Sequence, residues 1–395
     1  MLPRPGTNGA LLGAGAPLHL QWIEDIVGFP RQDDIATGER KNTVPESSKV
    51  AIFDGHNDVV QHLDEYREGG RDFLVRSEDG HLDLPRAQEG GMIGGLFALF
   101  AKPERPPEGN VTRTADGYEV RLADPLDAVY ARSRINSQLS ALKHVVARAG
   151  GKIRWATTVD EIEAGRRDGT FVMVLHVEGA EAIDADLDGL ETLYSSGLRS
   201  LGLVWSRPNI FGHGVPFAYP RSPDIGPGLT DAGKALVRAC NRLGIMLDVS
   251  HLNERGFWDM AAISTAPMVA THACAHAICR STRNLTDRQL DAVRESGGVV
   301  GFNFSVSDVR PDAHRDPDIP INAVTEHLSY LVERMGEDHV ALGSDFDGAL
   351  MPLPIRDASH LPNLIQSLRA HGFDDATVRK IAFDNWMRVF RLIWR

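Results

Sequence analysis

The chain has little cysteine, no long apolar run and no excess of positive charge. Its 395 residues include only three cysteines, Cys240, Cys274 and Cys279, whose spacing matches no zinc knuckle. We therefore expect buried, reduced thiols rather than a disulfide framework, and a cytoplasmic location. A run of about 18 apolar residues is absent, so we expect no span of a membrane. The formal net charge of −12 argues against nucleic acid as a partner, because phosphate binding needs a basic surface.

The composition of the chain changes near residue 49. Residues 1–48 are rich in glycine, proline and polar side chains without clear periodicity, and we predict an irregular N-terminal arm there. This arm has no sustained apolar core behind a basic start, so it does not resemble a signal peptide. From residue 49 to residue 395, apolar strand-like runs alternate with stretches of helical period. That alternation indicates parallel βαβ units in a single domain.

Eight runs rich in valine, isoleucine, leucine and phenylalanine predict strands that are buried on both faces. Eight parallel strands in βα order favour one closed (β/α)8 TIM-type barrel, of the α/β class, over two open sheets. An amphipathic helix over Asp375–Trp394 is expected at the end of the chain. The predicted strands are Val50–Asp54, Gly94–Phe100, Phe171–Val177, Ser200–Trp205, Ile245–Ser250, Met268–Thr271, Val299–Phe304 and Val340–Ser344.

Potential metal ligands stand where several of these strands end, and these residues are His56, Asp58, Glu178, His251 and His272. The carboxyl ends of parallel barrel strands meet at one mouth, so we expect the five side chains to gather there. A glutamate directly after an apolar strand is either a buried ion-pair partner or a ligand, because an unpaired buried carboxylate is too costly. We predict that His56, Asp58 and Glu178 surround one ion. The same Glu178 would surround a second ion together with His251 and His272.

Glu178 is the predicted bridge between the two ions. Many two-metal barrels bridge their ions with a carboxylated lysine, but the predicted strand Ser200–Trp205 contains no lysine. Imidazole and carboxylate ligands with open positions suit zinc, and less often manganese, cobalt or iron. Two such ions about 3.5–4 Å apart would hold a bridging hydroxide and polarise a carbonyl group. The pattern therefore predicts a metal-dependent hydrolase.

Three further residues are candidates for roles at the same mouth. Asp345 closes the last predicted strand in GSDFDG, where it could accept a proton from the bridging water and pass it to a leaving amine. Asp347 competes for this role, and both acids could instead cap a loop, but we favour Asp345 as the catalytic residue. Arg283 follows the sixth predicted strand in STRNLTD, where a guanidinium could hold a substrate carboxylate through two hydrogen bonds. A plain surface position is the alternative for Arg283.

The segments DGHND, HVEG, DVSH, THACAHAICRSTRNLTD and GSDFDG, in this order, resemble a known family from residue 50 to residue 395. It is the membrane dipeptidase (renal dipeptidase) family, peptidase family M19. Its members are binuclear zinc barrels of the amidohydrolase type that hydrolyse dipeptides, often tolerate a D-residue at the C-terminal position, and are often dimers. The resemblance implies the same five zinc ligands with Glu178 as the bridge. It also implies Asp345 as the proton-transfer residue and Arg283 as the binder of the substrate C-terminal carboxylate.

One position departs from the family pattern. After the fourth strand the family usually has a histidine that helps to polarise the scissile carbonyl, whereas this chain has Trp205 in LGLVWSRPN. His213 in the following FGHG loop, Asn209 and Arg207 are candidates to replace that histidine, or carbonyl activation rests on the metal alone. No hydrophobic tail follows Arg395, so the membrane anchor of the vertebrate members is not implied.

The leading hypothesis is a binuclear zinc dipeptidase in which a metal-bridging hydroxide attacks the peptide carbonyl of a small dipeptide. The first alternative is an amidohydrolase that acts on N-acyl amino acids or other small amides, with Trp205 shaping an apolar pocket. The second alternative is a non-catalytic barrel that serves as a scaffold. That reading would need a broken ligand set, and all five predicted ligands are present. A homodimer is left open.

Overall fold

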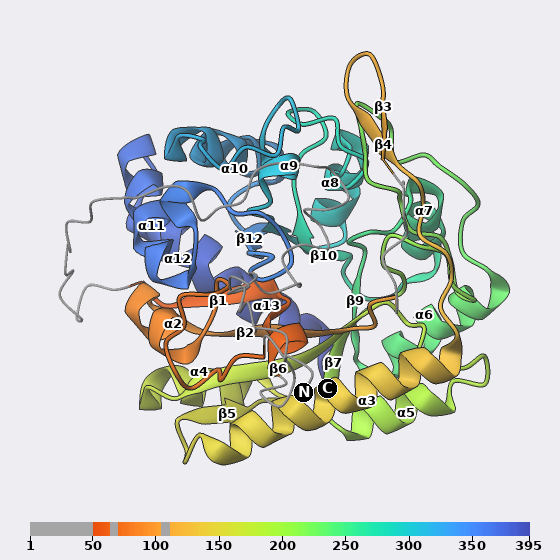
Figure 1. Ribbon diagram of the computed structural model, residues 1–395, viewed down its shortest axis with the longest axis horizontal. Coiled ribbons are helices and arrows are strands. Elements are labelled where there is room, and N and C mark those ends of the chain that lie inside the picture. Colours follow the sequence, from red (N-terminus) through yellow and green to blue (C-terminus); the bar gives the residue numbers. More distant parts are fainter. Residues whose placement is uncertain (1–49, 64–69, 104–110) are drawn as a thin grey trace, which may run out of the picture.

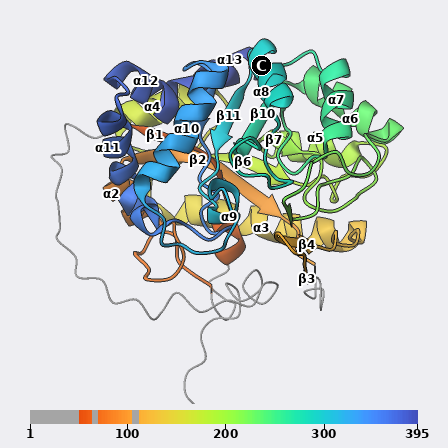
Figure 2. The same ribbon diagram turned by 90° about the horizontal axis from the view of Figure 1, so that it is seen from above.

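The structure, a computed structural model, describes residues 50–63, 70–103 and 111–395 (Figure 1). The predicted N-terminal arm, residues 1–48, lies outside the described residues. Helices and strands alternate along the described chain, and Figures 1 and 2 show helices surrounding a central set of strands. This is the α/β arrangement that the sequence predicts.

Eight parallel strands form the wall of the barrel in the order β1-β2-β6-β7-β9-β10-β11-β12. Each of the eight predicted strands overlaps one of them, which confirms the predicted (β/α)8 TIM-type barrel. An additional strand, β5 (Ile153–Trp155), pairs with the first residues of β6 and was not predicted. The eight strands are β1 (Ile52–Asn57), β2 (Met92–Phe100), β6 (Phe171–Glu178), β7 (Leu198–Gly202), β9 (Met246–Asp248), β10 (Val269–Ala273), β11 (Val299–Phe302) and β12 (Val340–Leu342).

The barrel closes between its first and last strands through one buried carboxylate. Asp54 accepts hydrogen bonds from the Ser344 backbone N–H at 2.7 Å and from the Ser344 hydroxyl at 3.0 Å. A parallel bridge between Asn57 and Phe346 continues the contact toward the carboxyl ends of the two strands. Burial raises the pKa of Asp54 to about 6, against the effect of these hydrogen bonds. The segment after β12 is therefore hydrogen-bonded to β1, the strand that contains His56.

Helices follow the strands and cover the barrel from outside. Local sequence sets their ends: Thr158 and Glu161 form a capping box, Thr230 caps the next long helix, and Gly244 ends that helix in a left-handed conformation. The helices are α2 (Leu84–Gly90), α3 (Ala128–Arg148), α4 (Val159–Asp168), α5 (Asp188–Ser195), α6 (Asp231–Leu243), α7 (Glu254–Ile263), α8 (Asp287–Glu295), α9 (Val306–Val309), α10 (Ile321–Met335), α11 (Leu361–His371), α12 (Asp375–Arg379) and α13 (Asn385–Ile393), with short η3 (Val59–His62), η4 (Leu353–Ile355) and η5 (Ala358–His360).

The predicted terminal helix Asp375–Trp394 is divided in the structure. A π-helical turn, η6 (Lys380–Asp384), separates α12 from α13. A second small sheet, built from β3 (Val111–Arg113), β4 (Tyr118–Val120) and β8 (Ala218–Tyr219), was not predicted, because strands of two or three residues carry no readable period. The β3–β4 hairpin projects at the edge of the molecule in Figure 1.

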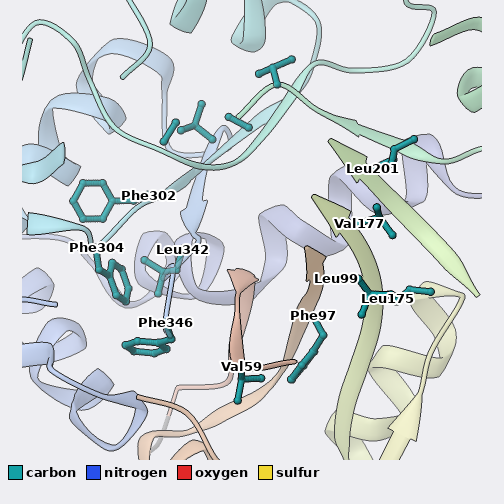
Figure 3. Close-up of a cluster of buried hydrophobic side chains, with 14 of the residues drawn as sticks. Val59, Phe97, Leu99, Leu175, Val177, Leu201, Phe302, Phe304, Leu342 and Phe346 are labelled. Carbon is teal, nitrogen blue, oxygen red and sulfur yellow. The ribbon is translucent and has the colours of Figure 1, made fainter. Parts of the chain in front are cut away.

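Alternate residues of β6 belong to different layers of the core. Met173, Leu175 and Val177 join the large cluster that the surrounding helices cover, part of which Figure 3 shows. Val172 and Val174 join a second cluster made from the first residues of most barrel strands. Because side chains alternate along a strand, the residues of the same parity as Val172 face the barrel interior. His176 and Glu178 continue that interior row toward the mouth.

The C-terminal helix fills the barrel end opposite the mouth. Trp386 of α13 is fully buried, and its indole N–H donates a 3.0 Å hydrogen bond to the carbonyl oxygen of Leu342. A Cβ added at Gly55 would lie 2.2 Å from the Trp386 ring, so glycine is required at that position of β1. Phe390 of the same helix contacts Phe53 edge to face. These side chains close the lower end with apolar groups.

All three cysteines are buried and free of disulfide bonds, as predicted. None of the helices in the described part of the chain combines the length and the hydropathy that crossing a bilayer requires.

Candidate metal centre

The five predicted ligands converge at the mouth around one carboxylate oxygen. Glu178 Oε1 lies 3.0 Å from His251 Nε2, 3.5 Å from His272 Nε2 and 3.8 Å from His56 Nε2. The carboxylate of Asp58 lies 3.3 Å from His56 Nε2. All five residues are buried. Strand ends from four parts of the chain thus supply three imidazoles and two carboxylates to one small volume.

The ligand atoms divide into two groups that share Glu178. One group is His56, Asp58 and Glu178, and the other is Glu178, His251 and His272. Within each group the candidate ligand atoms all lie within 4.8 Å of one another. They are two of the four such groups in the described part of the chain. The sequence predicts these same two sets as the ligands of two ions, and that assignment stays a prediction.

The charge balance of these residues favours a bound cation. Burial raises the pKa of Glu178 well above its usual range and lowers the pKa of His251 and His272 well below theirs. Burial also opposes a charge on His56, but the negative charges of Glu178 and Asp58 outweigh it and raise the pKa of His56 to about 10. Neither ring nitrogen of His56 has a well-directed hydrogen bond among the described residues. This donor set fits divalent metal ions, which would satisfy these lone pairs.

Hydroxyl groups orient two of the histidines, and sequence reasoning missed them. Ser206 Oγ lies 2.8 Å from His251 Nδ1, and Thr271 Oγ1 lies 2.9 Å from His272 Nδ1. Thr271 also donates a 2.6 Å hydrogen bond to the buried carboxylate of Asp248. Each contact engages Nδ1 and leaves Nε2 to face Glu178, which is the usual task of residues behind a metal ligand. The sequence offered one signal for these two hydroxyl groups: Thr271 precedes the predicted ligand His272, and Ser206 follows a predicted strand.

His176 lies one layer deeper in the barrel than the ligands. Its Nδ1 lies 2.8 Å from Ser200 Oγ, and its Nε2 lies 3.7 Å from Asp248 Oδ2. With His56 and Asp248 it forms another group whose ligand atoms approach within 4.8 Å. Burial lowers the pKa of His176 to about 4. The structure places the ring of His176 in edge-to-face contact with that of His56.

Asp345 faces the ligands, whereas Asp347 is engaged elsewhere. Asp345 forms a group with His56 and His272 that could hold a metal ion, and Asn303 donates a 3.1 Å hydrogen bond to its Oδ2. Burial, together with the charge of Asp58, raises the pKa of Asp345 to about 7. A carboxyl group with such a pKa can both accept and release a proton near neutral pH.

Arg283 is buried beside the ligands rather than exposed on the surface. Its guanidinium donates a 3.4 Å hydrogen bond to the carbonyl oxygen of His272. Its positive charge partly opposes the rise in the pKa values of Glu178 and Asp345 that burial causes. The same charge adds to the lowering of the pKa of His251. The structure therefore excludes the surface alternative for Arg283.

Trp205 lies in the loop after β7, three residues beyond the end of the strand, although the sequence predicted it as the last strand residue. Its ring centroid is 5.7 Å from that of His251, 5.0 Å from Phe100 and 5.6 Å from Phe217. The guanidinium of Arg207 lies 5.3 Å from the same ring. Trp205 thus forms an aromatic wall beside a candidate ligand.

Asn209 and His213 are placed less directly. The Asn209 amide donates to the carbonyl oxygen of Leu203, and its oxygen accepts hydrogen bonds from the backbone N–H groups of Phe211 and Gly212. Asn209 therefore shapes its own loop. His213 accepts a backbone hydrogen bond from Asn253, and none of the interactions found among the described residues joins its side chain to the ligands.

A sequence model of the membrane dipeptidase family (peptidase family M19) matches residues 40–394. The crystal structure of the dipeptidase AC, a family M19 metallopeptidase, is 45% identical and has a TM-score of 0.82, over 88% of this chain and 99% of that chain. A metallopeptidase from Rhodobacter sphaeroides, liganded with a phosphinate mimic of the dipeptide L-Ala-D-Ala, is 44% identical with the same TM-score, over 88% and 100%. Dipeptidase tcpJ of Claviceps purpurea is 26% identical, over 93% of this chain and 83% of that protein. The chain therefore belongs to the membrane dipeptidase family of metallopeptidases, family M19.

Proposed function

We propose that the chain is a two-zinc dipeptidase that hydrolyses the peptide bond of small dipeptides. The observation that carries the proposal is the position of Glu178 Oε1 between the imidazoles of both ligand groups. His56, Asp58 and Glu178 would hold one ion, and Glu178, His251 and His272 the other. Bound zinc would supply Lewis acidity, polarising the scissile carbonyl and activating water.

The residues of the chain perform the remaining steps. Arg283, buried beside the ligands, binds the C-terminal carboxylate of the dipeptide through its guanidinium N–H groups and so sets the direction in which the substrate lies. Asp345 accepts the proton released as water adds to the carbonyl carbon and gives it to the leaving amine, while the C–N bond breaks. Trp205 forms one apolar wall of the pocket and keeps water away from that side.

We propose dipeptides with a C-terminal D-residue as the substrate class. Support comes from the Rhodobacter sphaeroides metallopeptidase, which is 44% identical to this chain and was captured with a mimic of L-Ala-D-Ala. Smaller amides are the competing substrate class, because Trp205 stands at the position of the usual family histidine.

A substrate comparison on zinc-loaded protein tests the proposal. L-Ala-D-Ala, L-Ala-L-Ala and N-acetyl-D-Ala are compared by kcat/KM, with Glu178→Gln as the control for background hydrolysis. We expect L-Ala-D-Ala to be the best of the three. Hydrolysis of N-acetyl-D-Ala without hydrolysis of either dipeptide would favour the amidohydrolase alternative, and no hydrolysis of any of the three would favour the scaffold.

A Trp205→Ala variant tests the proposed pocket wall. Loss of the indole removes apolar contact area but no group that moves a proton. We expect KM for L-Ala-D-Ala to rise by about tenfold while kcat changes little. A fall in kcat at unchanged KM would show that Trp205 acts on the chemical step instead.

A further inference from the structure

The segment after β12 has an unusual backbone. Asp345 and Asp347 both adopt left-handed conformations, with φ of +60° and +67°, and Phe346 between them is fully buried. Such a conformation is unfavourable for a non-glycine residue and persists only where its surroundings impose it. Contacts outside this segment must therefore hold it in place.

Asp347 provides those contacts, away from the metal ligands. Its Oδ1 forms an ion pair with Arg71 Nη2 at 2.7 Å and accepts a 2.8 Å hydrogen bond from the backbone N–H of His81. In return, the backbone N–H of Asp347 donates a 2.9 Å hydrogen bond to His81 Nδ1. The side chain of each of these two residues, Asp347 and His81, thus accepts a hydrogen bond from the backbone N–H of the other. We call Asp347, Arg71 and His81 the Asp347 lock.

The partners of Asp347 are themselves held firmly. Arg71 Nη1 donates a 2.6 Å hydrogen bond to the carbonyl oxygen of Asp79, and Arg86 Nη1 donates a 2.7 Å hydrogen bond to that of Gly80. Gly80 has a φ of +63°, and a Cβ there would lie 2.3 Å from Asp347 Oδ1. The carbonyl oxygen of His81 accepts a hydrogen bond from Ala358 N–H. Residues 71–81 therefore form a fixed base for the lock.

On the other side of the same turn, the backbone is packed tightly against the candidate site. A Cβ added at Gly348 would lie 2.1 Å from Asp58 Oδ2 and 2.3 Å from Asp345 Oδ1. The backbone N–H groups of Gly348 and Ala349 donate hydrogen bonds to the carbonyl oxygen of Asp345. Because the turn is packed this tightly, a shift of the backbone at Asp347 also moves Asp345.

We propose that Asp347, held by Arg71 and His81, is a positioning residue that fixes the Asp345 carboxylate for proton transfer. The inference rests on the proposed role of Asp345. Asp347 acts through the backbone of the turn, because its Oδ1 is engaged by Arg71 and His81 and none of the interactions found among the described residues joins its carboxylate to the candidate ligands.

The test uses the zinc-loaded full chain and L-Ala-D-Ala. Asp347→Asn keeps the shape of the side chain and removes its charge, so the ion pair with Arg71 is lost. We expect kcat to fall by about 10–100-fold, KM to change little and the metal content to stay at the wild-type value. Arg71→Gln removes the same ion pair by changing the arginine and should have the same effect. The double variant should be no worse than either single variant, because both remove one interaction.

A second background separates positioning from an independent role. In an Asp345→Asn protein, adding Asp347→Asn should cause no further loss of kcat. An additional loss of the same size as in the wild type would overturn the proposal, as would an unchanged kcat in Asp347→Asn. Asp375→Asn, which alters an exposed ion pair with Arg369, is the matched control and should behave as wild type.

The same variants distinguish this inference from the proposed function. Wild-type kcat in the Asp345→Asn single variant would contradict proton transfer by Asp345. A large loss in Asp345→Asn together with wild-type kcat in Asp347→Asn and Arg71→Gln would contradict only the positioning role. If Asp347→Asn fails to fold, Arg71→Gln and His81→Asn provide the same measurement.

Discussion

The two ends of the barrel are built on the same strands but differ in chemistry. At the amino ends of the strands, apolar residues such as Val172 and Met246 pack against Trp386 and Phe390 of the C-terminal helix. At the carboxyl ends, imidazoles and carboxylates are buried around Glu178. β6 passes from one region to the other within a single strand. The fold thus separates a stabilising end from an end where function can be placed.

The mouth of the barrel is maintained at a cost in stability. Burying charged groups is unfavourable unless partners compensate them, whereas burying apolar groups is favourable. Left-handed backbone at His251, Asp345 and Asp347 adds strain at the mouth. Substitutions at the mouth should therefore reduce activity without lowering the free energy of unfolding. Substitutions at the base should lower the free energy of unfolding without reducing activity.

The largest effect is expected from Glu178→Gln, which alters the residue shared by both ligand groups. Because the glutamine has the same shape but no charge, metal binding and dipeptide hydrolysis should be lost together. The metal-free variant should be as stable as the metal-free wild type, since no uncompensated buried charge is created. Added zinc should raise the Tm of the wild type only. Full activity in Glu178→Gln would refute a bridging role.

Trp386→Ala tests the base of the barrel. Truncating this buried ring should lower the free energy of unfolding by about 3–5 kcal/mol. The kcat of the folded protein should stay within about twofold of the wild type, because Trp386 belongs to the apolar cluster and donates its hydrogen bond to Leu342 rather than to a candidate ligand. Leu392→Ala, at a 60% exposed position of the same helix, is the matched control and should change stability by less than about 0.5 kcal/mol. A large fall in kcat for Trp386→Ala would remove the contrast between the two ends.

His327 should make part of the stability depend on pH. It is buried, with Nε2 accepting from the Ala275 N–H and Nδ1 facing the Val309 carbonyl oxygen, and burial lowers its pKa from 6.5 to about 4. Between these two values the unfolded chain binds more protons, so stability is complete above pH 6.5 and is lost as the pH falls toward 4. The loss amounts to roughly 3 kcal/mol.

Chemical denaturation of metal-free protein from pH 7 to pH 4, compared between the wild type and His327→Gln, measures this loss. His327→Gln should make the unfolding free energy less dependent on pH than in the wild type, because glutamine does not titrate while other buried histidines such as His176 still do. Trp386→Phe should lower stability and leave the slope as in the wild type. An unchanged slope in His327→Gln would show that its ionisation is not coupled to folding.

The smallest of these effects is expected from Ser206→Ala, which removes the hydroxyl beside His251 Nδ1. Loss of such an orienting contact typically weakens metal affinity by about 10–100-fold. The variant should bind zinc at the same stoichiometry with lower affinity, as measured by competition with a chelator. Ser264→Ala, whose hydroxyl contacts only a nearby loop residue, is a control. Equal zinc affinity in both variants would mean that Ser206 does not orient the ligand.

The strands and the convergence of the five candidate ligands could be predicted from the sequence for one reason. Each ligand follows an apolar run along the chain, and parallel barrel topology brings all such ends together. Glu178, for example, is recognisable because FVMVLHV precedes it directly. The short strand β5 (Ile153–Trp155) was missed because three residues show no period.

Contacts between distant residues could not be predicted in this way. His81 and Asp347 are 266 positions apart, and nothing in either local sequence indicates their pairing. The sequence therefore presented Asp347 as a competitor of Asp345, whereas the structure shows it bound to Arg71 and His81. Ser206 is similar, since its role depends on reaching His251, 45 positions away.

The metal content of the purified chain tests the central claim most directly. Protein prepared without chelator, supplied with zinc and then freed of excess metal is measured for the molar ratio of zinc to chain. The shared position of Glu178 between two ligand groups predicts two zinc ions per chain for the wild type. A ratio below one, in protein that still hydrolyses L-Ala-D-Ala, would contradict the proposed two-metal centre.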